Sequence, residues 1–333
     1  MCINNTNKWY TKTNIKSTTS TSFGIDKIYK SSLLSSREML LKIYSLFILS
    51  LDLITLFFGI WLSIILAIYR SFNPPSLKSL HGEIAMVVGA GRGVGREIAI
   101  QLSQLGAIVA CIDINEDMCN KTSNKAIRYS DKLQVENTVK KIRADFGDVT
   151  MVIHCCGVPS PRVLIRETPE IQKAMELSVI SHFWLLDAVL PSMEKAGRGH
   201  IVALSSVAGF SGGSSRGGRV QLTAAQFAIQ GLTESLNSEL RQVNSNIVVT
   251  LVHIYPFILG AEMEKDIRLR IPSYFGTMPA TEAAKNILDG VRRNYTEFSV
   301  PGYLLYLGHI LRILPKTASF LLRDFLDTGV DFG

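Results

Sequence analysis

The sequence predicts a doubly wound α/β domain, built on a parallel sheet and preceded by an N-terminal membrane anchor. Strand-length apolar runs alternate with helical segments from Ile84 onward, a pattern typical of parallel sheets with helices on both faces. A glycine-rich turn follows the first of these runs and opens a helix. An apolar block over Ile43–Tyr69 precedes the domain and is long enough to cross a bilayer.

Composition divides the chain into successive segments. Residues 1–38 are rich in Ser, Thr, Asn and Lys without hydrophobic periodicity, which predicts a disordered tail, and Met39 is an alternative translation start. We then expect a transmembrane or monotopic anchor over 39–70, a linker over 71–82, the α/β domain over 83–302 and an amphipathic extension over 303–333. The extension is expected either on a membrane, over a pocket or in a dimer contact.

The apolar block carries Asp52 as its single charge, which favours a retained anchor over the core helix of a soluble domain. A signal peptide would have a shorter apolar core and a small-residue cleavage site. Because a charge at mid-bilayer is costly, either Leu53–Tyr69 alone enters the membrane or the block forms a shallow hairpin. Basic residues flank both ends of the block, so the positive-inside rule leaves its orientation open.

Charge and cysteine usage limit the classes of partner. The formal net charge is +7, but the Lys and Arg residues are scattered and form no basic cluster with interleaved aromatics, so we expect no nucleic-acid partner. Flanking positive charge instead suits anionic headgroups and makes a lipid bilayer the expected partner. The five cysteines show neither a disulfide framework nor metal-ligand spacing, which predicts a reducing, cytosol-facing location and no metal site.

Strands and helices are expected in alternation along the domain. Val135, Val139, Ile142 and Phe146 share one helical face, and Gly147 ends that helix. We expect strands over 84–88, 107–113, 149–156, 200–206 and 246–255, and helices over 95–105, 135–147, 167–175, 182–193 and around Gln226.

The glycine-rich turn has the features of a dinucleotide site. Gly89, Gly93 and Gly95 lie between a strand and a helix, where glycine lets the main chain approach a pyrophosphate and the helix N-terminus offers free N–H groups. Asp113 ends the next strand, where an acid binds the ribose hydroxyls of NAD and repels the additional phosphate of NADP. Arg92 would attract that phosphate, so NADP is the alternative to the favoured NAD. A tight turn that binds nothing is the remaining interpretation.

Three motifs together resemble the short-chain dehydrogenase/reductase family: GAGRGVG, SHFWLLDAVLPSM and HIVALSSVAGF. With the anchor they resemble its membrane-bound branch, which holds 17-beta-hydroxysteroid dehydrogenases of types 11 and 13 and retinol dehydrogenases of the epidermal and type 10 kind, over roughly Leu40–Phe325. The resemblance implies a Rossmann-like sheet of about seven strands, a nicotinamide cofactor and a lipophilic alcohol or ketone as substrate. It also implies residence on endoplasmic reticulum or lipid droplets, and a homodimer or a heterodimer with an active relative.

The resemblance carries site residues over one at a time. Ser206 stands where the family serine hydrogen-bonds the substrate oxygen, and Gly157 matches the glycine of the family's Asn-Asn-Ala-Gly turn beside the cofactor. Asp131 is a candidate adenine contact. His154 and Cys155 replace the two asparagines of that turn. In a rearranged site, His154 is a candidate general acid.

The family's catalytic acid–base pair is replaced. Leu222 and Gln226 stand where the resemblance implies Tyr and Lys, and the segment 206–256 has a single tyrosine, on the following strand, and no lysine. Ser178 and Ala261 likewise replace the catalytic asparagine and a nicotinamide-binding threonine. We therefore predict a catalytically impaired homologue that binds a nucleotide or a lipophilic ligand. The alternatives are a working NAD(P)-dependent oxidoreductase with a rearranged site and a ligand-free membrane scaffold.

Overall fold

The computed structural model describes residues 22–113, 126–127, 132–155, 172, 175–206, 209, 220–254, 258–259 and 278–326. For 22–36, 126–127, 220–222, 258–259 and 323–326 it describes the course of the backbone alone. The chain divides into two compact units between Pro74 and Pro75.

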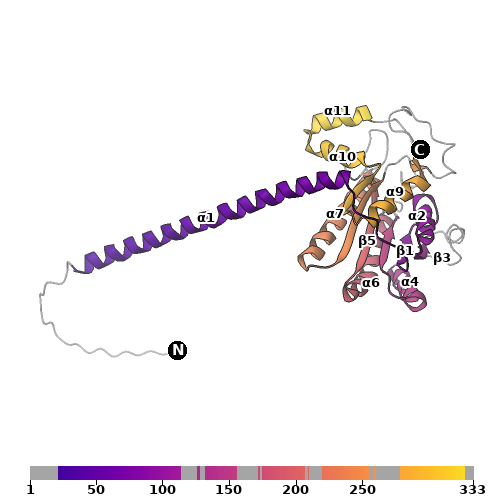
Figure 1. Cartoon of the computed structure of the whole chain (residues 1–333), viewed down its shortest axis with the longest axis horizontal. Helices are drawn as coiled ribbons and strands as arrows, with labels where there is room; N and C mark the ends of the chain where they lie inside the picture. Colours follow the sequence, from indigo (N-terminus) through magenta and orange to yellow (C-terminus); the bar gives the residue numbers. More distant parts are fainter. Residues whose placement is uncertain are drawn as a thin grey trace, which may run out of the picture. The chain divides into compact units, whose positions relative to one another are not determined.

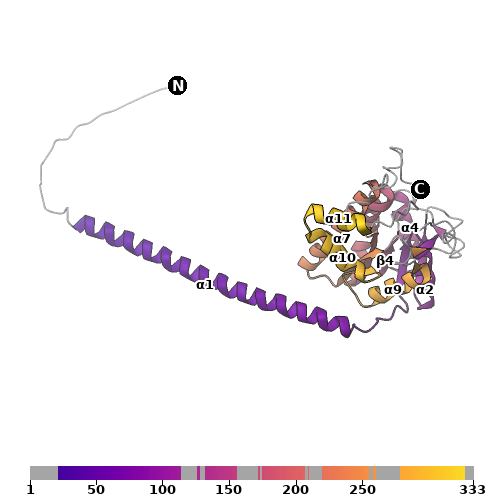
Figure 2. The same ribbon diagram turned by 90° about the horizontal axis from the view of Figure 1, so that it is seen from above.

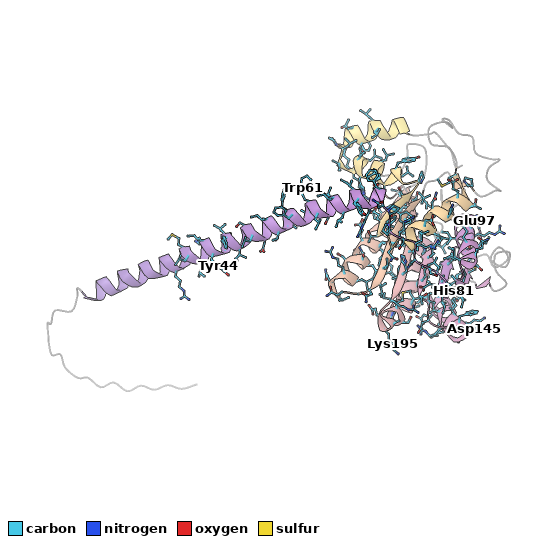
Figure 3. The ribbon with its side chains drawn as sticks, in the orientation of Figure 1. Tyr44, Trp61, His81, Glu97, Asp145 and Lys195 are labelled. Carbon is cyan, nitrogen blue, oxygen red and sulfur yellow. The ribbon has the colours of Figure 1, made fainter. Side chains whose placement is uncertain are left out.

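The first unit contains α1 (Ser22–Phe72), one helix of 51 residues (Figure 1). Its segment Arg37–Phe72 is long and apolar enough to cross a membrane, by length and composition. Its apolar side chains are exposed, and Figure 3 shows Tyr44 and Trp61 projecting from the helix. Hydroxyl groups within this segment donate to carbonyl oxygens three or four residues earlier, at 2.7–2.9 Å: Ser45, Ser50, Thr55 and Ser63. Such internal hydrogen bonds satisfy polar groups that lipid cannot.

The course of α1 corrects two expectations. The helix begins at Ser22, inside the segment predicted to be disordered, because adding residues to an existing helix costs far less than nucleating one. The helix also runs through Asp52 without a break, so the shallow hairpin is wrong.

The second unit is organised around a seven-stranded sheet whose paired strands are all parallel, which confirms the predicted fold class. Its strand order is β3-β2-β1-β4-β5-β6-β9. The strands are β1 (Ile84–Val88), β2 (Ile108–Ile112), β3 (Ala126–Ile127), β4 (Met151–His154), β5 (Gly199–Ser206), β6 (Ile247–Ile254) and β9 (Glu297–Val300). A second, two-stranded sheet pairs β7 (Ile258–Leu259) with β8 (Met278–Pro279). The order reverses between β1 and β4, the place where such sheets bind their ligands.

Helices cover both faces of the sheet, as Figures 1 and 2 show from two sides. One core joins α2 (Gly93–Gln104) and α9 (Ala280–Arg292) to the face that carries Ala85 and Val87. The other joins α4 (Lys132–Phe146) and α6 (Ser181–Ala196) to the face that carries Met86 and Val88. Further helical elements are the π-helix η1 (Glu176–Ile180), α7 (Val220–Gln242), α10 (Tyr303–Ile313) and α11 (Lys316–Leu326). Alternate residues of one strand thus enter opposite cores, because strand side chains alternate between faces.

The predicted apolar face of α4 is correct except at its end. Val135, Val139 and Ile142 are buried, but Phe146 is 45% exposed in the last turn. Gly147 follows with φ +108°, a conformation that suits glycine, so the predicted stop is confirmed. The helix expected over 167–175 lies almost wholly outside the described residues.

The predicted linker 71–82 belongs largely to the α/β domain. The second unit begins at Pro75. We call residues 75–80 the strap. The Lys78 N–H donates to the carbonyl of Arg292 at 3.0 Å, and the Arg292 Nε donates to the carbonyl of Lys78 at 2.9 Å. Leu80 is 1% exposed. The Lys78 Nζ donates to Nδ1 of His200 at 2.8 Å. Burial and, secondarily, the Lys78 charge lower the pKa of His200 to about 3, so this imidazole is a neutral acceptor. The strap is therefore fixed to the domain.

Candidate functional site

The glycine-rich turn between β1 and α2 is tightly determined by its main chain. Gly89 and Gly93 have φ of +85° and +57°, which L-residues with a side chain rarely adopt. A Cβ at Gly95 would lie 2.1 Å from the carbonyl oxygen of Gly89. The N–H groups of Gly89 and Ala90 both donate to the carbonyl of Ile112, at 2.7 and 3.2 Å. The turn is therefore closed against the end of β2 and leaves no room for a side chain at Gly95.

The helix that follows presents a site suited to an anion. Arg92 is the N-cap of α2, with extended φ of −154° and no hydrogen bond from its side chain to the helix end. The first N–H groups of a helix have no intrahelical acceptor and lie at the positive end of its dipole. The first turn of α2 carries no acidic side chain that would compete. A pyrophosphate is the ligand that this arrangement favours.

Asp113 lies beside the turn, as predicted. Its Oδ2 accepts a hydrogen bond from the N–H of Gly91 at 2.8 Å, and the residue is half-buried. This contact holds a carboxylate next to the site where a ribose would follow the pyrophosphate. Asp131 and Gly157, the other two predicted cofactor contacts, lie outside the described residues.

At the carboxyl end of β4, His154 faces α6. Its ring lies 3.5 Å from that of His182, centroid to centroid. The Ser181 hydroxyl donates to the carbonyl of Leu177 at 2.7 Å, so its oxygen accepts from Nε2 of His154 at 2.8 Å. His154 is 1% exposed. Its Nε2 proton is thus donated to Ser181 within the core. The structure does not support His154 as a general acid for a substrate.

His182 was missed by sequence reasoning. Its Nδ1 donates to the carbonyl oxygen of Ser178, one turn earlier, at 3.0 Å. Burial lowers the pKa of His182 to about 4, so the ring is neutral. Ser178 itself is 4% exposed and lies in η1, a π-helical turn of a kind often found at functional sites. The i, i+4 spacing from Ser178 to a histidine was the one sequence feature that could have indicated this contact.

Gln226 joins the end of β5 to α7. Its side chain is fully buried, and its Oε1 accepts two hydrogen bonds, from the Ser205 hydroxyl at 2.9 Å and from the Ser206 N–H at 2.8 Å. A lysine ammonium has three donors and no acceptor, so it could not accept from the Ser206 N–H, and the Ser205 hydroxyl could meet it only as an acceptor. Sequence reasoning selected Gln226 but missed Ser205. The β5–α7 junction is therefore built around an amide acceptor.

Of the remaining predicted positions, Ser206 ends β5 and is 7% exposed. Leu222 lies in the first turn of α7, where only the backbone is described. Ala261 lies outside the described residues. Within the part of the chain that the structure describes, no group of three or more His, Cys, Asp or Glu residues could hold a metal ion.

A further pair, between β6 and β9, was not predicted. His253 pairs in register with Ser205, and its Nε2 contacts Oε1 of Glu297 at 2.8 Å. The His253 side chain is fully buried, and this hydrogen bond is the main cause that lowers the pKa of Glu297. Glu297 is therefore ionised, and the pair ties β6 to β9.

Comparison with known proteins gives the family. The model of the short chain dehydrogenase family matches residues 83–271, more than half of the chain. Human 17-beta-hydroxysteroid dehydrogenase 13 is 27% identical over 285 residues, which cover 82% of this chain and 93% of the relative. Mouse epidermal retinol dehydrogenase 2 is 26% identical, covering 75% and 84%.

Solved structures agree on the fold. A putative short-chain dehydrogenase/reductase from Burkholderia xenovorans superposes with a TM-score of 0.57 at 24% identity, covering 69% of this chain and 98% of the other. A short chain dehydrogenase from Salmonella enterica gives 0.56 at 20%, covering 68% and 98%. Because the family model matches more than half of the chain, the chain belongs to the short-chain dehydrogenase family.

Proposed function

We propose that this protein is a membrane-anchored short-chain dehydrogenase homologue that binds a nicotinamide nucleotide and has little alcohol dehydrogenase activity. One contrast carries the proposal. The main-chain turn at Gly89–Gly95 is intact, whereas Gln226, which the resemblance aligns with the family lysine, is bonded to Ser205 and Ser206.

The residues present fit a dinucleotide. The N-terminus of α2 would hold the pyrophosphate, and Asp113, fixed by Gly91, would accept from the ribose hydroxyls. The carboxylate would repel the 2′-phosphate of NADP, so we infer a preference for NAD over NADP. The nicotinamide ring of such a cofactor accepts or donates hydride, and family membership supports a cofactor of this class.

The acid–base step is the part that the chain lacks. In the family, the resemblance implies a tyrosine that moves a proton at the substrate oxygen and a lysine one helical turn later that supports it. Leu222 has no ionisable proton, and Gln226 carries no charge. A positioned acid–base group typically contributes about 10²–10⁴ in rate. We therefore infer that alcohol oxidation by this chain is slow even with cofactor bound.

Ligand class and location follow from the relatives. Their names describe enzymes that act on hydroxysteroids, estradiol and retinol, all of them lipophilic alcohols or ketones. We infer a lipophilic small molecule as ligand, an endoplasmic reticulum or lipid droplet membrane as location, and a domain that faces the cytosol. We also infer a homodimer or a heterodimer with an active relative, in which this chain would be the less active subunit.

The test is calorimetric titration of the full chain, reconstituted in vesicles, with NADH and then NADPH. The proposal predicts micromolar binding, on the order of −8 kcal/mol, and tighter binding of NADH. Tighter NADPH would mean that Arg92 outweighs Asp113. Binding of neither nucleotide by a folded chain would contradict the proposal and leave a membrane scaffold.

A further inference from the structure

The outer face of α10 is unusually apolar for an exposed surface. Its side chains at spacings of three and four residues, Tyr303, Tyr306, Ile310 and Ile313, are 46%, 67%, 49% and 83% exposed. This spacing places them on one stripe of the helix. We call them the α10 stripe. Contiguous exposed apolar side chains of this kind mark an interaction surface.

The inner face of α10 packs on the domain. The stripe, on the opposite face, can therefore contact only a partner outside the domain. Leu304 is 5% exposed beneath the helix. Arg312 donates from Nη2 to the carbonyl of Gly209 and to Oε1 of Gln230 in α7, each at 2.8 Å. Its guanidinium also lies 5.5 Å from the centre of the Phe227 ring, a cation–π contact. The stripe is thus held rigidly and points away from the core.

The next helix extends the same character. In α11, Phe320 and Leu321 are 51% and 69% exposed, and Lys316 at its start is exposed as well. None of the described side chains from Tyr303 to Leu322 is acidic. Apolar side chains with tyrosines and basic neighbours are what a helix in the headgroup region of a bilayer requires.

We propose that the α10 stripe, with Phe320 and Leu321, docks on the lipid bilayer. The chain itself favours this partner over a protein. It carries a segment apolar enough to cross a membrane, Arg37–Phe72, and the α/β domain begins at Pro75, three residues after that segment ends. The bilayer is therefore the surface that the domain meets first. Basic and apolar exposure without acid matches anionic lipid.

Docking in this way also places the candidate site near lipid. Gly209, which Arg312 holds, follows Ser206 by three residues. A lipophilic ligand could then pass from the bilayer to the site beside α10. This consequence rests on the proposed function, whereas the docking itself does not require any turnover or nucleotide.

The test is photo-crosslinking in the reconstituted full chain. The crosslinker p-benzoylphenylalanine replaces Tyr306 or Ile313, in vesicles of phosphatidylcholine with phosphatidylserine, and mass spectrometry identifies the adducts. Phe183 of α6, 56% exposed, is the matched control position. The proposal predicts lipid adducts at positions 306 and 313 and none at 183. Crosslinks that join two copies of the chain, absence of lipid adducts at 306 and 313, or equal lipid adducts at 183 would overturn it.

A charge substitution sharpens the test. Ile310→Glu puts an acidic group in the stripe at a side chain that is 49% exposed, and the thermal unfolding temperature of the variant checks that the domain stays folded. We expect the lipid adduct at 306 to fall by roughly tenfold or more, because a carboxylate is expensive in hydrocarbon. Phe183→Glu should leave that adduct unchanged. An adduct yield unaffected by Ile310→Glu would contradict the proposal. Because no arm measures nucleotide binding, failure here is distinct from failure of the proposed function.

Discussion

Two junctions on the same edge of the sheet differ in how they are built. The β1–α2 turn depends on main-chain geometry, with Gly95 packed against Gly89 and one carboxylate, Asp113, bonded to Gly91. The β5–α7 junction depends on side chains, with the amide of Gln226 as the common acceptor. A site made by the main chain persists as long as its glycines do. A site made by side chains can lose its chemistry through two substitutions while the fold stays intact.

The largest expected effect is at the side-chain junction. Gln226→Lys introduces the residue that the resemblance implies at this position, leaves the Ser205 hydroxyl and the Ser206 N–H without the amide oxygen as acceptor, and buries an ammonium. We expect a loss of about 3–5 kcal/mol in the free energy of unfolding, because an uncompensated charge is left in the core. Urea unfolding of the reconstituted chain measures it.

The matched control is Gln226→Glu, which keeps an oxygen acceptor for both donors and should cost less than the lysine. If Gln226→Lys were as stable as the parent chain, the junction would still accommodate the family pair, and the contrast between the two junctions would disappear. If Gln226→Lys is destabilised as expected, the double variant Leu222→Tyr with Gln226→Lys should not restore activity without further changes around Ser205.

At the main-chain junction, Gly95→Ala should lower the free energy of unfolding by about 3 kcal/mol or more. The new methyl group would clash with a main-chain atom, which cannot move aside as a flexible side chain could. The new Cβ would lie 2.1 Å from a carbonyl oxygen. NADH titration should show loss of binding as well. Gly231→Ala, in α7 where a Cβ meets nothing within 4 Å, is the control and should stabilise by about 0.5–1 kcal/mol. A Gly95→Ala chain with normal NADH affinity would refute the main-chain account.

His182, buried against His154 at the end of β4, predicts acid sensitivity. The pKa of His182 falls from 6.5 to about 4 on folding, because of burial. Between these values the unfolded chain binds more protons, so stability falls as pH falls from 6.5 to about 4, by on the order of 3 kcal/mol. Stability should not change on this account above pH 6.5. Urea unfolding from pH 7 to 4.5 should show a shallower loss for His182→Leu, and an identical slope would contradict the prediction.

The smallest expected effect concerns cofactor choice. Asp113→Asn keeps an oxygen for the Gly91 N–H and removes only the charge. We expect the preference for NADH over NADPH to fall by about 1 kcal/mol, five- to tenfold in affinity ratio, because the repulsion of the 2′-phosphate is lost. Paired titrations with both nucleotides measure it. An unchanged ratio would assign the preference to residues other than Asp113.

The features that sequence predicted are local ones. Apolar runs bounded by turns predicted the strands, and the spacing of the glycines predicted the β1–α2 turn. Both features depend on residues that are neighbours in the sequence. Partners distant in sequence could not be predicted. Gln226 is 20 residues from Ser206, and Lys78 is 122 residues from His200, so the contact of each depends on how the sheet brings strands together. The predicted linker failed for this reason, since nothing near Lys78 indicates that it docks on β5.

Catalysis in a nucleotide-bound sample tests the central contrast most directly. The full chain in vesicles is saturated with NAD and offered retinol, a steroid alcohol and a fatty alcohol, while NADH formation is followed by absorbance. We predict that the chain binds the nucleotide yet forms NADH at least about 10²-fold more slowly than an ordinary enzyme. Turnover of any of these alcohols at an ordinary enzyme rate, about 1 s⁻¹ or more, would contradict it and establish a working site without the family pair.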